Sequence, residues 1–489
     1  MKNITLSDLT NSQKEAFAGL SEFIEAPITK DINSRVAVLI GKAGTGKTTL
    51  IRLILDEYLE SDRQFDRDEE FGSDTKYGGS SMSFNFSSPK VQGVALAHKA
   101  KNVLANSIHF VNTFAGYFGL KEQYDESGKL KFIRDDYKMS RSNCKKPHKV
   151  AVHDECSMYD AEMLATVTEE TYHSAKIIFM GDSSQISPIS SEGDDDSPVF
   201  SYFKNRFYLE ERVRQTEGNP IVDLSDIIHE QIFREIKNNE VDDRIKIVLA
   251  AISKENIVDG KGFTHLKYKD FLEDYRKSSV DYLDSKVIAY RNAKVLDFNR
   301  QIRNYLYKNP TVPFIDGEII YMNDTYYSDK DDTDQKSKWV CYNSDEYKIS
   351  AVTKGSLIEE VDCNLLYIDK TGHKHLQGVE SPYIPIVSPL GKKQFTLTSN
   401  WRKSQVFKAE PYKRGQKWKY YYDFVNLFGN ISYGYCYTAH KSQGSTFHTV
   451  YIDINDILMI GPISTKRKLQ AIYTAVTRAS HLVKFLKSN

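Results

Sequence analysis

Cysteine and long apolar runs are both scarce in this chain of 489 residues. The five cysteines form no C-x-x-C pair and their number is odd, so neither a disulfide framework nor a zinc ribbon is indicated. This pattern fits a reducing compartment, and we expect a cytoplasmic protein. No apolar run approaches the roughly 18 residues of a membrane span, and the polar amino terminus does not resemble a signal peptide. We therefore expect no membrane association.

Net charge is also missing, because 66 Lys and Arg residues balance 66 Asp and Glu residues. Global charge therefore gives no hint of nucleic-acid binding, and any such surface must be local. Aromatic residues, in contrast, are plentiful, with 31 Tyr. They could pack in cores or stack on nucleic-acid bases, and composition does not decide between the two. The length predicts about three domains.

Strand and helix patterns alternate along much of the chain. A helix is predicted over residues 13–25, with Thr10 or Ser12 as its N-cap. A mostly parallel sheet is indicated, because apolar strand patterns alternate with helical ones. The strands are predicted at residues 36–40, 91–97, 149–152, 176–180 and 286–290, the last followed by a helix to about residue 306.

Three segments depart from this alternation. Residues 61–90 are charged and then rich in Gly and Ser, and we interpret them as a surface insertion. Residues 123–133 predict a β-hairpin with a glycine turn. Residues 310–430 predict a β-rich insert, after which strand–helix alternation returns at 432–489.

A glycine-rich loop follows the strand predicted at residues 36–40. Its sequence, GKAGTGKT, matches G-x-x-x-x-G-K-[ST] between a strand and a helix. The glycines let successive N–H groups point at phosphate oxygens, and the helix terminus adds positive potential. We expect Lys47 to contact the β- and γ-phosphates of ATP, and the Thr48 hydroxyl to hold Mg²⁺. The predicted nucleotide-binding residues here are Gly41, Lys42, Ala43, Gly44, Thr45, Gly46, Lys47, Thr48 and Thr49.

Polar side chains end two further predicted strands. Asp154 and Glu155 follow the strand at residues 149–152, and Gln185 follows the strand at 176–180. An isolated Asp-Glu pair is usually a solvated surface pair, but its place after a buried-type strand favours function. We expect Asp154 to be the Mg²⁺ ligand and Glu155 the base for the attacking water. Gln185 is predicted to reach the γ-phosphate or that water.

These three motifs, in this order, resemble those of superfamily 1 helicases. The forms T-x-H-K-x-Q-G and Y-T-A-x-T-R-A are typical of the RecD-like, 5′-to-3′ B branch, and within it the chain is most similar to the Dda-like helicases of T-even bacteriophages. Leu96-Ala97 replaces the usual Pro-Thr before His98, and Ala115 replaces the usual His of motif Ib. The matching segments are residues 9–14 (Q motif), 95–100 (Ia), 113–114 (Ib), 212–215 (IV), 287–292 (the opening strand of the second motor domain), 438–446 (V, with the form T-x-H-K-x-Q-G) and 473–479 (VI, with the form Y-T-A-x-T-R-A).

The resemblance implies an α/β fold with two RecA-like P-loop domains, a β-hairpin pin insertion and a β-rich SH3-like insertion. RecA-like domain 1A is expected at residues 1–205, with the pin hairpin at about 118–148. RecA-like domain 2A is expected at 206–309 and 432–489, and the SH3-like 2B insertion with its tower at 310–431.

The resemblance also assigns roles at the ATP site. Gln13 is expected to read the adenine edge, and Gly444 of motif V to contact the nucleotide. Arg214 and Arg478 would reach the γ-phosphate across the cleft between the RecA-like domains, where such arginines contribute about 10³–10⁵ in rate. The expected catalytic residues are Lys47, Glu155, Gln185, Arg214 and Arg478.

Contacts to DNA follow from the resemblance as well. Leu130 or Phe132 of the hairpin would split the last base pair, or would belong to the hairpin core. The basic stretches at residues 129–149 and 402–419 are interleaved with aromatics and could contact the DNA backbone or be solvated faces. The track on the motor domains is expected to include His98, Lys99, Thr113, Thr438, His440 and Lys441.

Together these features predict an ATP-dependent DNA helicase that moves 5′ to 3′ on single-stranded DNA and unwinds duplex, in replication, recombination or repair. The expected partners are single-stranded and forked DNA, with a single-strand-binding protein as a further candidate, and we expect a monomer. The polarity rests on the resemblance alone. Three alternatives stay open at this point: a translocase that displaces bound proteins without processive unwinding, a nucleotide-binding scaffold, and an enzyme that moves on RNA.

Overall fold

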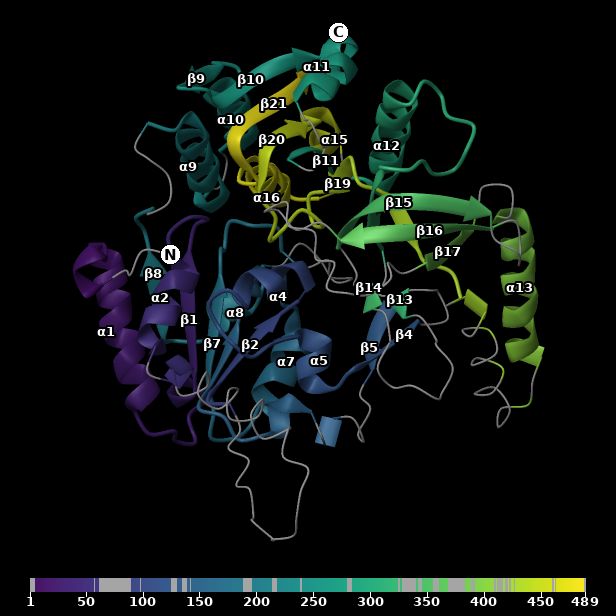
Figure 1. Cartoon of the computed structure of the whole chain (residues 1–489). Helices are drawn as coiled ribbons and strands as arrows, with labels where there is room; N and C mark the ends of the chain where they lie inside the picture. The colour runs from purple at the N-terminus through teal and green to yellow at the C-terminus, as the bar shows by residue number, and fades with distance from the viewer. Residues whose placement is uncertain are drawn as a thin grey trace. The chain divides into compact units, whose positions relative to one another are not determined.

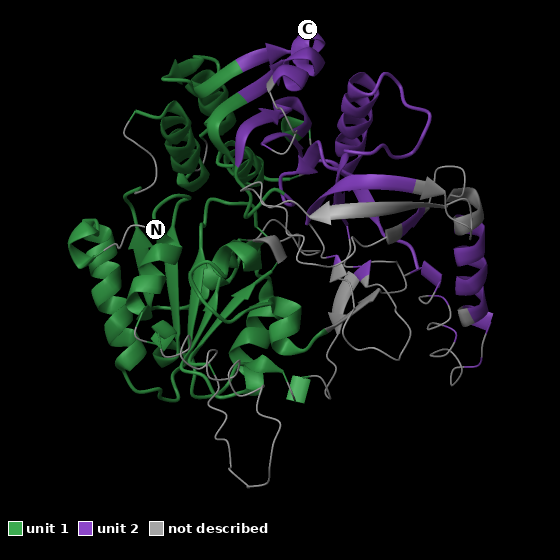
Figure 2. Cartoon of the chain, viewed as in Figure 1, with its two compact units in different colours: residues 1–264, 442–446, 457–483 green, residues 265–441, 447–456, 484–489 purple. Residues whose placement is uncertain are grey.

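The computed structural model of the chain is drawn in Figure 1, and it divides into two compact units. Figure 2 shows unit 1, which comprises residues 1–264, 442–446 and 457–483, and unit 2, which comprises 265–441, 447–456 and 484–489. The residues that the structure describes are 5–56, 58–60, 89–96, 98–124, 130–133, 139–140, 142–187, 196–212, 218–237, 240–278, 284–323, 326–327, 340–341, 345–354, 360–367, 383–387, 392–408, 410, 417, 421, 424–425, 427–459, 461 and 463–487.

A six-stranded sheet of order β3-β2-β6-β7-β1-β8 lies at the centre of unit 1. All five of its described strand pairs are parallel. The four predicted strands in this part of the chain are therefore confirmed. The strands are β1 (Val36–Gly41), β2 (Val91–Ala95), β3 (Val111–Thr113), β6 (Val150–His153), β7 (Lys176–Gly181) and β8 (Arg206–Leu209).

Helix α1 (Asn11–Glu25) begins at a capping box. Thr10 Oγ1 accepts from the Gln13 backbone N–H, while Gln13 Oε1 accepts from the Thr10 N–H at 3.0 Å, so both otherwise unpaired donors are satisfied. This confirms the helix and its cap. The other helices of unit 1 are α2 (Lys47–Ile54), α4 (His98–Leu104), α5 (Phe114–Phe118), α7 (Ala161–Glu170), α8 (Val199–Tyr202), α9 (Pro220–Phe233), α10 (Arg244–Ile252) and α16 (Thr465–Val476).

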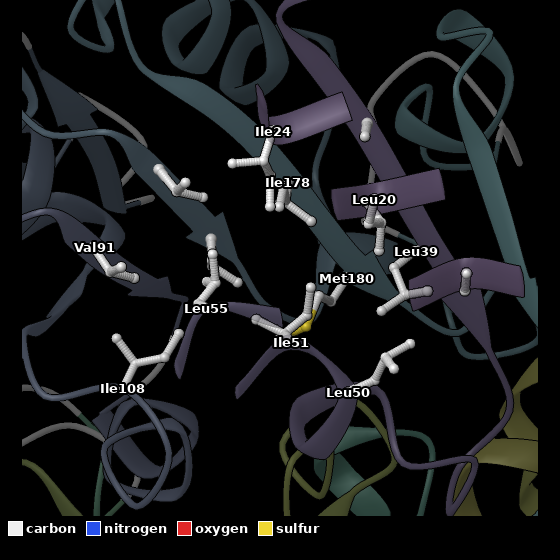
Figure 3. Packing of buried hydrophobic residues seen from close by; sticks show 14 of the residues in the cluster. Leu20, Ile24, Leu39, Leu50, Ile51, Leu55, Val91, Ile108, Ile178 and Met180 are labelled. Carbon is white, nitrogen blue, oxygen red and sulfur yellow. The ribbon is translucent and has the colours of Figure 1, made fainter. Parts of the chain in front are cut away.

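Apolar side chains of α1, α2 and the sheet form one buried cluster (Figure 3). Each fully buried side chain of this kind contributes about 1.5–3 kcal/mol relative to an exposed one. The packing fixes α2, the helix whose first residue is Lys47, against the sheet. The residues labelled in the figure are Leu20, Ile24, Leu39, Leu50, Ile51, Leu55, Val91, Ile108, Ile178 and Met180.

The predicted hairpin is confirmed as an antiparallel pair, β4 (Lys121–Tyr124) and β5 (Leu130–Ile133). Tyr124 lies opposite Leu130, and Glu122 lies opposite Phe132. The turn at 125–129 and the side chains of both strands lie outside the described residues, as does most of the predicted insertion at 61–90. The role of the hairpin as a pin therefore stays a prediction.

A second six-stranded sheet has the order β19-β11-β20-β21-β10-β9. Its strand β11 (Ser285–Ala289) pairs in parallel with β19 (Cys436–Thr438) and β20 (Phe447–Ile452). Segments before and after the predicted insert are thus neighbouring strands, and the insert interrupts the parallel part of this sheet. The remaining elements here are β9 (Asn256–Val258), β10 (Lys261–Lys267), β21 (Ala479–Lys487), α11 (Phe271–Ser278), α12 (Asn292–Leu306) and α15 (Ile454–Leu458).

The insert is β-rich, as predicted, and its main sheet has the order β17-β16-β15-β12-β18. It also contains a helix that was not predicted, α13 (Lys392–Lys408). The strands are β12 (Ile319–Met322), β13 (Tyr326–Tyr327), β14 (Val340–Cys341), β15 (Glu346–Lys354), β16 (Glu360–Tyr367), β17 (Tyr383–Val387) and β18 (Ile431–Tyr433).

Among the described helices, none combines the length and the apolarity of a membrane span.

Two ion pairs with buried cations join the insert to the rest of unit 2. Arg303 of α12 places Nε 2.6 Å from Glu318 Oε1, just before β12. Lys286 of β11 places Nζ 3.8 Å from Glu346 Oε2 of β15. Both cations are buried. Removing one partner of either pair therefore leaves a charge without its counter-ion, which strongly destabilises the fold.

Candidate nucleotide site

The glycine-rich loop connects β1 to α2 in a tightly curled conformation. Gly44 and Gly46 have φ angles of 84° and 81°, in the left-handed region that glycine adopts without strain. At Gly41 an added Cβ would lie 2.6 Å from Thr45 Oγ1. That hydroxyl donates to the Lys42 carbonyl at 2.9 Å. Glycine is therefore favoured at these three positions of the loop.

Two lysines of the loop have different surroundings. Lys47 Nζ donates to the carbonyls of Gly41 at 2.6 Å and Lys42 at 3.1 Å, so the ammonium lies within the curve of the loop. Lys42 Nζ instead donates to Asp226 Oδ1 of α9 at 2.7 Å. Arg212 also contacts Asp226, at 3.0 Å. Only Lys47 is thus placed inside the loop, where the sequence predicts the phosphates.

The buried side chain of Gln13 anchors the loop from α1. Its Nε2 donates to the Thr45 carbonyl at 2.9 Å, while its Oε1 completes the capping box with Thr10. Gln13 therefore has an architectural role beside the predicted contact with adenine, which stays a prediction.

Asp154 and Glu155 lie directly after β6. Glu155 has a φ angle of 54°, uncommon for a residue with a side chain, and its N–H donates to Asp154 Oδ1 at 2.9 Å. Burial raises the pKa of Asp154. Burial, and then the charge of Asp154, raises the pKa of Glu155 to about 7, against the opposing charges of Arg478 and Lys47. These four groups thus form one electrostatic cluster.

Gln185 is buried beside a segment of motif V. Its Oε1 accepts from Gln443 Nε2 at 3.3 Å. The next residue, Gly444, has a φ angle of 69°, and a Cβ there would lie 4.0 Å from Glu155 Oε1. Motif V therefore reaches the carboxylate that is predicted to activate water, within unit 1.

Arg478 is buried at the end of α16. Its Nε donates to the Thr474 carbonyl at 3.1 Å and its Nη1 to the Ser445 carbonyl at 3.2 Å. Burial lowers the pKa of Arg478, and the charges of Glu155 and Asp182 oppose this effect. The charges of Arg478 and Glu155 thus influence each other within unit 1. The contact of Arg478 with the γ-phosphate stays a prediction, and Arg214 lies outside the described residues.

The predicted DNA residues divide between the two units. In unit 1, Thr113 caps α5 by accepting from the Gly116 N–H at 3.2 Å, and His98 and Lys99 begin α4, with side chains outside the described part of the chain. In unit 2, Thr438 Oγ1 accepts from the Lys441 N–H at 3.2 Å. Thr113 and Thr438 therefore have local structural roles whether or not they touch DNA.

Lys441 and His440 face aromatic neighbours within unit 2. Lys441 Nζ donates to Asn323 Oδ1 at 2.9 Å and lies 4.7 Å from the centre of the Tyr321 ring. The His440 ring is 5.6 Å from that of Tyr290. The motif V loop is thus held against β12 of the insert, a relationship that the sequence did not indicate.

Three residues of the site were not predicted to have a role. Gln443 stands inside motif V, and Asp182 lies three residues before Gln185, so position in or near a recognised motif was an available signal. Tyr473 opens motif VI, but its partner Asp182 is 291 residues away in the sequence. Such a pairing is set by tertiary packing and leaves no local signal.

The oxygen-bearing side chains predicted to bind the metal are of the chemical type that Mg²⁺ prefers. The Thr48 hydroxyl and the Asp154 carboxylate offer hard oxygen atoms, which Mg²⁺ prefers. Within the described part of the chain, no group of three His, Cys, Asp or Glu residues could form a self-sufficient metal site. A cation held by few protein oxygens together with substrate phosphates suits this arrangement.

Two family models match the chain and together cover more than half of it. Residues 25–248 match an AAA domain, and residues 433–486 match the UvrD-like helicase C-terminal domain. The first model contains the glycine-rich loop and Glu155, and the second contains Gly444 and Arg478.

Individual proteins extend this similarity. The chain is 25% identical over 337 residues to the ATP-dependent DNA helicase dda of Enterobacteria phage T4, which covers 66% of this chain and 63% of that protein. It is 23% identical over 386 residues to the uncharacterised protein R530 of Acanthamoeba polyphaga mimivirus, which covers 69% of this chain and 74% of that protein. The structure of Pif1 helicase from Bacteroides in complex with ADP-AlF3 and ssDNA has a TM-score of 0.45 at 13% identity, covering 97% of this chain and 92% of that one. The ordered motifs, the two family models and the similarity to Dda together support an ATP-dependent DNA helicase of superfamily 1 that resembles Dda.

Proposed function

We propose that this ATP-dependent DNA helicase moves 5′ to 3′ along single-stranded DNA and separates the duplex ahead of it. The observation that carries the proposal is the cluster of Lys47, Asp154, Glu155 and Arg478 in unit 1. A site that only binds nucleotide needs neither a base for water nor an arginine for the transferring phosphoryl group. The arrangement therefore favours a hydrolytic motor over a scaffold.

Each side chain has a distinct task in the proposed reaction. Lys47 and the loop N–H groups hold the phosphates, and Arg478 neutralises charge on the transferring phosphoryl group. Glu155 accepts the proton of the attacking water, and burial strengthens it as a base by raising the pKa of its carboxylate. Thr48 and Asp154 would hold Mg²⁺, which supplies further neutralisation of phosphate charge when bound.

For the DNA side of the proposal, helix α13 is a candidate contact. Its sequence has five Lys or Arg residues and no Asp or Glu. Leu397 and Trp401, one helical turn apart, are 63% and 56% exposed. Exposed aromatics stack on unpaired bases, while cations attract the backbone. We therefore include α13 with His440 and Lys441 in the proposed single-strand path.

Measurement of ATP hydrolysis with and without a single-stranded oligonucleotide tests the proposal. Turnover should be weak alone and should rise strongly with DNA. Lys47→Ala should abolish it, while Glu15→Ala, an exposed change on α1 outside the Q motif, should leave it intact. If DNA did not stimulate ATP hydrolysis, or if Lys47→Ala were fully active, the proposal of a DNA-dependent motor would be wrong. RNA oligonucleotides in the same assay decide which nucleic acid is the track.

Strand separation distinguishes a helicase from a translocase that only displaces proteins. We propose that Leu130 or Phe132 of β5 acts as the wedge. Replacing both by Ala should preserve DNA-stimulated hydrolysis and reduce unwinding. Unchanged unwinding by this variant would show that the wedge lies elsewhere.

A further inference from the structure

The carboxylate of Asp182, just after β7, connects three parts of unit 1. It is 2% exposed. Its Oδ2 accepts from the Ala43 N–H of the glycine-rich loop at 3.1 Å and from the Tyr473 hydroxyl at 2.9 Å. Its Oδ1 accepts from the Ser184 N–H at 3.0 Å. One buried side chain thus ties the loop to helix α16.

A second hydrogen bond joins α16 to the segment that follows β7, at the residue next to Tyr473. The Ile186 N–H donates to Thr474 Oγ1 at 3.1 Å, and Tyr473 and Thr474 are both fully buried. Consecutive residues of α16 are therefore bonded to the segment that follows β7. This double attachment restricts both sliding and rotation of the last turn of α16.

Arg478 is held by this same turn of helix. Its Nε donates to the carbonyl of Thr474, the residue that is fixed to Ile186. The place of the guanidinium relative to Glu155 therefore depends on how α16 is attached. A displacement of about 1 Å at a reacting centre can reduce the rate about 10²-fold.

We infer that Tyr473 and Asp182 are positioning residues, which set the place of Arg478 relative to Glu155 and the glycine-rich loop. The inference rests on the proposed function, because it assigns Arg478 to the transferring phosphoryl group. Tyr473 acts through its hydroxyl, since the ring alone could fill the same space. Asp182 accepts hydrogen bonds from both the loop and α16, so a displacement of either segment changes the position of the same carboxylate.

A purely structural role makes a different prediction. If the Tyr473 hydroxyl only satisfies a buried acceptor, its removal lowers the melting temperature and leaves kcat unchanged. If it positions Arg478, its removal lowers kcat and has little effect on the KM for ATP, because phosphate binding by Lys47 and the loop is preserved. Kinetics and stability therefore separate the two roles.

The test compares DNA-stimulated ATP hydrolysis of Tyr473→Phe, Arg478→Lys and the double variant. We expect Tyr473→Phe to lower kcat roughly tenfold or more, with KM within about twofold. The double variant should be no slower than Arg478→Lys, because both changes act on one step. Asp182→Asn, of the same size, should reproduce the kcat loss and keeps the test valid if Tyr473→Phe folds poorly.

Tyr275→Phe is the matched control. It removes another buried tyrosine hydroxyl, which donates to the Ser285 carbonyl at 3.0 Å in unit 2, and it should lower stability without changing kcat. An unchanged kcat in Tyr473→Phe, a rise confined to KM, or effects that multiply in the double variant would each overturn the inference. A wild-type protein without DNA-stimulated hydrolysis would instead contradict the proposed function.

Discussion

Gln13 Nε2 donates to the Thr45 carbonyl at 2.9 Å, and this bond ties helix α1 to the glycine-rich loop. Its oxygen is engaged with the Thr10 N–H at 3.0 Å, so the start of α1 and the loop share one side chain. Because Gln13 is buried, neither bond is easily replaced by water. The loop is thus bonded to Gln13 at Thr45 and to Asp182 at Ala43.

Replacement of Gln13 by Ala should destabilise the protein and weaken nucleotide binding. The Thr45 carbonyl and the Thr10 N–H would lose their partners, at a cost of about 1–3 kcal/mol. The KM for ATP should rise several-fold, and the melting temperature should fall. Glu15→Ala, at an exposed position of the same helix outside the Q motif, is the control. If neither quantity changed, the anchoring role would be refuted.

Acid should destabilise the protein partly through His148. Burial lowers the pKa of His148 to about 4 from the ordinary 6.5, and the ring nitrogens contact the Tyr117 hydroxyl at 2.9 Å and the Lys146 carbonyl at 2.8 Å. Between pH 6.5 and 4 the unfolded chain therefore binds more protons than the folded chain, so stability falls as the pH falls.

The substitution His148→Gln removes this proton uptake. The variant should be less stable than wild type at pH 7.5, because it loses packing and hydrogen bonds, but the difference should shrink at pH 4.5. Melting temperatures of both proteins across this range provide the measurement. An equal gap at every pH would be inconsistent with a buried neutral histidine.

The ion pair between Arg303 and Glu318 should be sensitive to loss of one partner. Arg303→Met leaves the buried Glu318 carboxylate without its cation, which costs about 3–5 kcal/mol. Adding Glu318→Gln should recover a large part of the loss, because the uncompensated charge is gone. Chemical denaturation measures the free energy of unfolding.

An exposed ion pair of the same unit provides the comparison. Lys277 Nζ lies 2.6 Å from Glu273 Oε1 on α11, with both side chains exposed. Lys277→Met should cost at most about 1 kcal/mol. Equal losses at the buried and exposed pairs would mean that Arg303 does not anchor the insert.

Trp401 of α13 should contribute to single-strand binding. Trp401→Ala should weaken binding of an oligonucleotide by about 1–3 kcal/mol, the range of base stacking on an aromatic side chain. Tyr202→Ala is the control, since Tyr202 is 66% exposed on α8 of unit 1. Equal affinities of wild type and Trp401→Ala, measured at fixed salt, would exclude α13 from the path.

The nucleotide side of the site was largely predictable from the sequence. The phosphate loop, Asp154, Glu155 and Gln185 each follow an apolar strand, and parallel strands bring their carboxyl ends to one edge of a sheet. Arg478 required the family resemblance, because nothing local distinguishes it from a surface arginine.

The bonds that hold these residues in place were not predictable. Lys42 with Asp226, and Asp182 with Tyr473, join positions 184 and 291 residues apart, and only packing brings them together. Helix α13 was missed because Leu397 and Trp401 are exposed, so its apolar residues do not mark a buried face.

Unwinding of two matched substrates tests the central claim most directly. One duplex carries a single-stranded 5′ tail and the other carries a 3′ tail of the same length and sequence, with ATP and Mg²⁺ present and Lys47→Ala as the inactive control. The account predicts that strand separation requires ATP and occurs from the 5′ tail. Preferential unwinding from the 3′ tail, or separation by Lys47→Ala, would contradict it.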